Sequence, residues 1–149
     1  MLHLIHPALL HFTVAFLIVG GGVEAAGLWT RRESLERLGA VLFALGVASL
    51  VPTAASGFLA ANSVDVPPAT AAALDRHEAS ALVLLAVGMG LLLWKAWGHG
   101  RVREGQRSLY AAALVVAAAL TVVTAFFGGV LVYGEGVGTA PVKSAPTSP

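Results

Sequence analysis

Residues 38–61 read LGAVLFALGVASLVPTAASGFLAA, and residues 109–132 read LYAAALVVAAALTVVTAFFGGVLV. Each stretch is longer than the roughly 20 apolar residues that a helix needs to cross a bilayer core of about 30 Å, and neither contains a charged side chain. Residues 8–28 and 79–97 have the same character, with a single charged side chain each. The sequence therefore predicts an all-α fold, an integral membrane bundle of four transmembrane helices.

The composition of the chain agrees with a membrane environment. Of its 149 residues, 57% are apolar and 11% are charged, whereas soluble domains carry about a quarter charged residues. Nine Lys and Arg nearly balance eight Asp and Glu, so no basic excess indicates a nucleic-acid partner. The chain has no cysteine, which excludes disulfides, thiol catalysis and cysteine-bound metals. We expect the lipid bilayer to be its main partner.

The four spans are joined by short connections, which predicts antiparallel neighbours within one transmembrane domain over residues 1–138. Residues 139–149 are rich in Pro, Ser and Thr, and we expect them to form a disordered outward tail. Gly and Ala are frequent along the helices, which favours close helix packing and a homo- or hetero-oligomer. Pro52 should kink the second helix. The sequence shows no convincing internal repeat.

The basic residues predict the orientation of the bundle. Seven of the nine Lys and Arg lie in or beside the first and third connections: Arg31, Arg32, Arg37, Lys95, Arg101, Arg103 and Arg107. By the positive-inside rule these connections face the cytoplasm, so both termini lie outside a bacterial cytoplasmic (inner) membrane as ends of a multi-pass protein. A cleaved signal peptide is the alternative for the first span, but no basic residue precedes its apolar run.

Histidine is the candidate functional residue. His3, His6, His11 and His77 all fall toward the predicted outer side, and His99 falls in a cytoplasmic connection. We expect His11 and His77 to face one another across the bundle, a geometry that ligates haem iron, with Arg76 placed to pair a propionate. In the alternative interpretation, these rings only form hydrogen bonds with each other, with a carbonyl or with water.

Two other polar features have their own interpretations. His3 and His6 could bind a divalent metal together with His77 and a carboxylate from Asp75 or Glu78, although a solvated His pair before Pro7 is the simpler expectation. Glu24 is the one acid inside a span. We expect it to reach the interface and pair with a neighbouring arginine of the first connection, Arg31, Arg32 or Arg37, while Lys95 extends its ammonium into the headgroups.

Four segments in order resemble a known family. LIHPALLHFTVAFL at the start, the Ser56-Gly57 pair, DRHEASA before the third span and GGVLVYGEGVG after the fourth are similar to bacterial four-helix membrane proteins known as domain of unknown function twenty-two thirty-one. The resemblance covers nearly the whole chain up to Val137. It implies that His6, Pro7, His11 and His77 belong to family motifs, and family members often look like haem-b or electron-transfer partners.

Three functions remain open from the sequence. The leading hypothesis is a small membrane subunit that binds haem b through His11 and His77 near the outer leaflet. It would pass electrons between a quinol or quinone and an outward redox partner. The second is a non-catalytic scaffold or assembly subunit, and the third is a transporter of a metal ion or small solute. A lone Glu24 without a pair of broken helices disfavours transport, and nothing predicts an enzyme acting on its own.

Overall fold

The computed structural model describes residues 2–62 and 68–137, with side chains at His6 and from Ala8 onward. Four long helices run through this part of the chain: α1 (Leu2–Thr30), α2 (Glu33–Ala61), α3 (Ala71–Trp97) and α4 (Arg107–Gly129). A short 3₁₀ turn, Glu104–Gln106, precedes α4, and a π-helical turn, Val130–Gly134, follows it. The all-α prediction is confirmed, since the described residues contain helices and turns and no strand.

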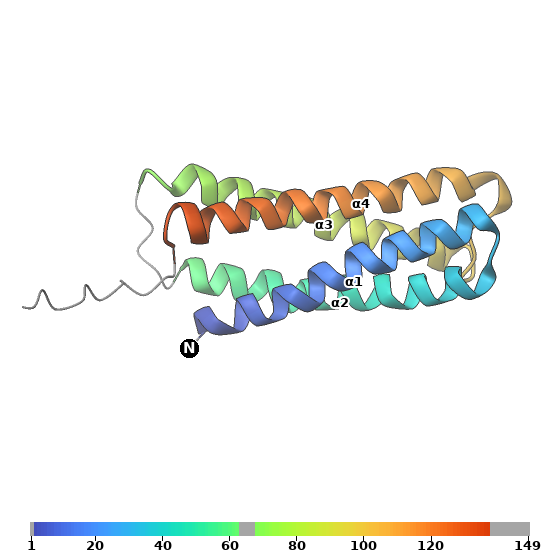
Figure 1. Cartoon of the computed structure of the whole chain (residues 1–149), viewed down its shortest axis with the longest axis horizontal. Coiled ribbons are helices and arrows are strands. Elements are labelled where there is room, and N and C mark those ends of the chain that lie inside the picture. The colour runs from blue at the N-terminus through green and yellow to red at the C-terminus, as the bar shows by residue number, and fades with distance from the viewer. Residues whose placement is uncertain (1, 63–67, 138–149) are drawn as a thin grey trace, which may run out of the picture.

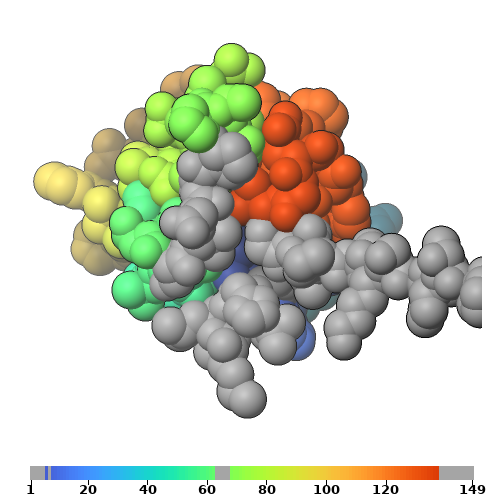
Figure 2. Space-filling model, turned by 90° about the vertical axis from the view of Figure 1, so that its left-hand side faces the viewer, coloured from blue at the N-terminus to red at the C-terminus, as the bar shows by residue number. Residues whose placement is uncertain are grey.

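The helices lie side by side as an antiparallel bundle (Figure 1). Around the ring, α1 contacts α2 and α4, and α3 contacts the same two helices, so α1 and α3 lie on one diagonal and α2 and α4 on the other. We call the end with the start of α1 the histidine end, and the opposite end, with the α1–α2 turn, the tryptophan end. Figure 2 looks onto the histidine end, where the start of α3 and the end of α4 are neighbours.

All four helices are long and apolar enough to cross a membrane. Their outward faces carry large apolar side chains such as Phe12, Val41, Leu93 and Phe126, each more than half exposed in the isolated chain. A bilayer is the solvent in which such faces are stable, because lipid tails cover them without loss of hydrogen bonds. α3 begins well before its apolar run, as its helix-forming residues suggest.

A short turn ends α1 and leads directly into α2. Arg31 adopts a positive φ of 56°, and the N–H of Arg32 donates to the carbonyl of Gly27 at 3.0 Å, which closes the C-terminus of α1. Glu33 and Glu36 then occupy the first turn of α2, where their negative charge is favourable for the helix dipole.

Glycines bring α1 and α2 together along much of their length. A Cβ added at Gly20 would strike the backbone of Phe43, and one added at Gly39 would strike the backbone of Glu24. Without side chains at these positions, the two backbones approach closely and gain dispersion contacts. These contacts stabilise the helix pair in lipid, where the burial of apolar surface contributes little. Pro52 faces outward, and α2 nevertheless continues as one helix from Glu33 to Ala61.

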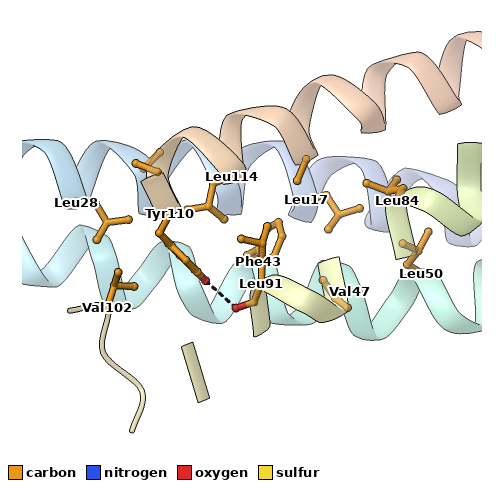
Figure 3. Packing of buried hydrophobic residues seen from close by; sticks show 13 residues of the cluster. Leu17, Leu28, Phe43, Val47, Leu50, Leu84, Leu91, Val102, Tyr110 and Leu114 are labelled. Atoms are coloured by element: carbon orange, nitrogen blue, oxygen red, sulfur yellow. Dashed lines mark hydrogen bonds between the residues drawn. The ribbon is translucent and has the colours of Figure 1, made fainter. Parts of the chain in front are cut away.

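The centre of the bundle is an apolar cluster to which every long helix contributes (Figure 3). Leu17, Phe43, Leu84 and Leu114 are almost completely buried there. Tyr110 is fully buried at the tryptophan side of the cluster, where its hydroxyl donates to the carbonyl of Leu91 at 3.3 Å. That hydrogen bond satisfies the hydroxyl, which is the one polar group of the side chain, so the burial of Tyr110 carries little desolvation cost.

The two halves of the bundle repeat one another with an offset of 71 residues, a relation that the sequence alone does not make convincing. His6 bonds to Thr53 and His77 bonds to Thr124, and both pairs span 47 positions. The sequences Thr53-Ala-Ala-Ser-Gly57 and Thr124-Ala-Phe-Phe-Gly128 share their first, second and last residues. The repeat relates these positions of α1 to positions of α3, and these positions of α2 to positions of α4.

Candidate functional site

His6 is held against α2 at the histidine end. Its Nδ1 lies 2.9 Å from the carbonyl oxygen of Thr53 and 3.2 Å from the hydroxyl of Ser56. The hydroxyl of Ser56 itself donates to the Thr53 carbonyl at 2.9 Å, so it accepts from His6. The ring rests on Gly57, where an added Cβ would come 3.0 Å from the imidazole Cε1. A larger residue at position 57 would therefore displace this half-buried ring.

His77 repeats this arrangement against α4. Its Nδ1 lies 3.1 Å from the carbonyl oxygen of Thr124. The ring rests on Gly128, where an added Cβ would again come 3.0 Å from Cε1. Half-buried like His6, this ring is anchored by the same two features of its partner helix, a threonine carbonyl and a glycine.

The carbonyl partners fix the tautomer of both rings. A carbonyl oxygen only accepts hydrogen bonds, so Nδ1 carries the hydrogen in His6 and in His77. In the neutral tautomer with hydrogen on Nδ1, Nε2 is the nitrogen with the lone pair. An Nδ1–H bonded to a backbone carbonyl is also the usual outer partner of a histidine that binds a metal through Nε2. Both rings therefore share the Nδ1 hydrogen bond that is typical of a metal-binding histidine.

The two rings belong to helices on opposite corners of the bundle. His6 lies on α1 and His77 on α3, at positions 71 residues apart that the repeat relates. The histidine end thus carries two similarly anchored imidazoles, one on α1 against α2 and one on α3 against α4.

The place expected for His11 is taken by His6. His11 lies exposed on the outer face of α1, and it follows His6 by five residues, which is about 140° around a helix. Since α1 is helical from Leu2, through Pro7, only one of these two histidines can face the interior. Arg76 is exposed at the same end, directly before His77, and its pairing with a propionate stays a prediction.

The divalent-metal alternative finds no support in the part of the chain that the structure describes. Within residues 2–62 and 68–137, no group of three or more His, Cys, Asp or Glu side chains is placed to hold a metal ion. The side chain of His3 lies outside the described set, so its share in such a site stays a prediction.

A buried hydroxyl cluster below His6 went unnoticed in the sequence. The hydroxyl of Thr13 lies 2.8 Å from that of Thr53 and 3.1 Å from that of Ser49. The repeat places Leu84 and Leu120 at the positions of Thr13 and Ser49. In that half, the buried hydroxyl of Thr124 has no partner among the described residues. A lone Thr or Ser in an apolar helix carries no sequence signal, so only the structure reveals the cluster.

The charged residues inside the bundle also pair differently from the expectation. Glu24 is buried and accepts from Lys95 of α3, with Nζ 2.5 Å from Oε1, rather than from an arginine of the first connection. Lys95 correspondingly turns inward, with its side chain 13% exposed, instead of extending into the headgroups. A buried carboxylate requires a partner inside the bundle, and the repeat brings Lys95 directly opposite.

A second diagonal pair has the same spacing. Arg107 of α4 donates to Glu36 of α2 at 3.1 Å, and these residues, like Glu24 and Lys95, are 71 positions apart. Glu24 lies about 27 Å from His6 along α1, at 1.5 Å per residue. The ion pairs therefore belong to a different level of the bundle and form no common site with the histidines.

Comparison with known proteins identifies the family of the chain. A family model described as a predicted membrane protein, DUF2231, matches residues 2–141. No curated protein and no solved structure matches the chain. The matched range includes both histidines and all four helices, in agreement with the motifs seen in the sequence. The chain belongs to the DUF2231 family of predicted membrane proteins.

Proposed function

We propose that this protein is a membrane electron-transfer subunit that holds haem b between His6 and His77. The observation that carries the proposal is the equivalent anchoring of the two rings, each with Nδ1 bonded to a threonine carbonyl. Anchoring of this kind orients Nε2 and raises its basicity as a ligand.

The donor set fits this cofactor better than it fits a bare metal ion. If haem b binds here, His6 and His77 would hold its iron, and the porphyrin would supply the remaining ligands. Two imidazoles suffice for such a site, and the lack of a third ligating side chain among the described residues is compatible with it. Haem b would supply one-electron chemistry, and Arg76 would pair with a propionate at the exposed end of the site.

The orientation of the protein would set the direction of electron flow. With the basic connections in the cytoplasm of a bacterium, the histidine end faces outward from the inner membrane. Electrons would then come from a membrane quinol and leave to a redox partner on the outer side. This direction rests on the distribution of Lys and Arg in the sequence.

Absorption spectroscopy of the purified protein tests the proposal. The full chain, made in haem-supplied cells and purified in mild detergent, should show sharp reduced bands with dithionite and a haem-b signature with pyridine. His6→Ala and His77→Ala should each remove the pigment. His11→Ala is the matched control, because it removes an exposed histidine of the same helix, and it should keep the spectrum.

The outcomes separate the remaining functions. A colourless wild-type protein that is folded by circular dichroism would overturn the haem proposal and favour a scaffold or assembly role. If His11→Ala lost the pigment and His6→Ala kept it, the ligand assignment would be wrong. Metal analysis of the same sample, with stoichiometric divalent ion and no haem, would instead favour a metal carrier.

A further inference from the structure

We propose that a pocket at the tryptophan end binds the phosphate group of an anionic membrane lipid. The pocket has a volume of about 380 Å³, and its lining includes Leu93, Trp94, Trp97, Arg101, Arg103 and Gln106. These residues come from the end of α3 and from the connection to α4. The pocket is far from the histidines and plays no part in the proposed electron transfer.

The connection between α3 and α4 is folded so that two arginines face the pocket. His99 and Gly100 have positive φ angles of 57° and 80°, which reverse the chain after α3. Val102 then inserts into the central apolar cluster and is 6% exposed. Its neighbours Arg101 and Arg103 are exposed and line the pocket, as expected when side chains alternate along an irregular, non-helical segment.

The charge of these two arginines is not neutralised within the described part of the chain. The acids near this end already have partners: Glu104 pairs with Arg31, Glu36 with Arg107, and Glu24 with Lys95. No ion pair involves Arg101 or Arg103 there. Guanidinium groups match phosphate oxygens in geometry and form strong charge-assisted hydrogen bonds with them. A phosphate is therefore the ligand group that best fits the polar side of the pocket.

The rest of the lining favours a lipid over a free phosphate ion. Trp94 is fixed by a hydrogen bond from Nε1 to Gln106 at 3.2 Å and by an edge-to-face contact with Tyr110. Trp97 is 85% exposed at the rim, the position of an interfacial tryptophan at headgroup level. Deeper along α3, Leu93 is exposed and Gly90 leaves open space. Such a surface accommodates an acyl chain directly below a bound headgroup.

Quenching by brominated lipids tests this proposal. The chain has three tryptophans, so in a Trp29→Phe background the emission comes from Trp94 and Trp97. The full chain is reconstituted in phosphatidylcholine vesicles that contain either brominated phosphatidylcholine or brominated phosphatidylglycerol. We expect stronger quenching by phosphatidylglycerol at equal mole fraction. Removing each arginine should weaken this preference about fivefold, so Arg101→Gln with Arg103→Gln should remove most of it.

A charge-matched control separates the pocket from the general surface charge. Arg32→Gln with Arg37→Gln removes two exposed arginines from the same end, outside the pocket, and should keep the preference. Equal quenching by the two lipids, or an equal loss in the control, would overturn the proposal. Inorganic phosphate at millimolar concentration should have no effect. If it abolished the preference for phosphatidylglycerol, the ligand would be a soluble anion rather than a lipid.

Discussion

Glu24 and Lys95 form a buried ion pair across the diagonal between α1 and α3, at positions that the internal repeat makes equivalent. Glu36 and Arg107 pair across the other diagonal at the same offset of 71 residues, which also separates His6 from His77. Counterpart residues of the repeat therefore contact one another across the bundle. At two levels of the bundle the counterparts have opposite charges, so residues at equivalent positions of the repeat form ion pairs with each other.

The stability of the protein should depend on the ion pair of Glu24 and Lys95, but not on which of the two helices carries which charge. Glu24→Gln or Lys95→Gln alone leaves a buried charge without a partner, which should destabilise the protein by about 3–5 kcal/mol. The exchange Glu24→Lys with Lys95→Glu keeps one buried charge of each sign inside the bundle, so we expect it to recover most of the lost unfolding free energy. Denaturant unfolding in detergent, followed by circular dichroism, measures these free energies.

The exposed pair of Arg37 and Glu33 provides the control for this experiment. Their side chains are 74% and 70% exposed, so Arg37→Gln should cost no more than about 0.5 kcal/mol. If the exchanged protein were as unstable as the single variants, the local surroundings rather than the pairing would determine the cost.

The close packing of α1 and α2 predicts a sharp difference between two nearby glycines. A Cβ at Gly20 would strike the backbone of Phe43, whereas one at Gly22 would meet no atom within 4 Å. Gly20→Ala should therefore force the helices apart and lower the unfolding free energy by about 1–3 kcal/mol. Gly22→Ala should be neutral or slightly stabilising, because alanine is the better helix former. Equal effects in thermal unfolding would contradict this packing.

Much of the fold followed from the sequence because length and apolar character alone define a transmembrane helix. The internal repeat could not be recognised in the sequence, because its equivalent charged positions carry residues of opposite sign. Glu24 corresponds to Lys95, and Glu36 corresponds to Arg107. Comparison of residue types treats such pairs as unrelated, although they are complementary in space. The ion-pair partners of Glu24 and Lys95 were missed for the same reason.

The candidate site was predictable in part. The position of His77 on an inward stripe could be read from the spacing of apolar residues around it, and the structure leaves it half-buried. The choice between His6 and His11 depends on where α1 begins, and Pro7 suggested a start near that residue. In the structure α1 begins at Leu2, with Pro7 as its sixth residue and one backbone hydrogen bond lost, and His6 contacts α2.

The glycines beneath the two histidines should control the geometry of the site. A Cβ at Gly57 or Gly128 would come 3.0 Å from an imidazole Cε1, so Gly57→Ala or Gly128→Ala should displace the ring by a few tenths of an ångström. We expect a shifted absorption spectrum, a lower pigment content and a weaker fold. Gly129→Ala is the control, since its Cβ would meet nothing within 4 Å. An unchanged spectrum in all three variants would mean that the rings do not hold the pigment.

The last prediction concerns the orientation of the bundle in the membrane. The chain has no cysteine, so single cysteines can be introduced and labelled without background. Gly105 and Ala69 lie exposed at opposite ends of the bundle. In bacterial spheroplasts a membrane-impermeant maleimide should label Ala69→Cys and leave Gly105→Cys unlabelled, because the positive-inside rule predicts that the basic connections face the cytoplasm. Both should react after permeabilisation. The reverse pattern would place the histidines on the cytoplasmic side and exclude an outward redox partner.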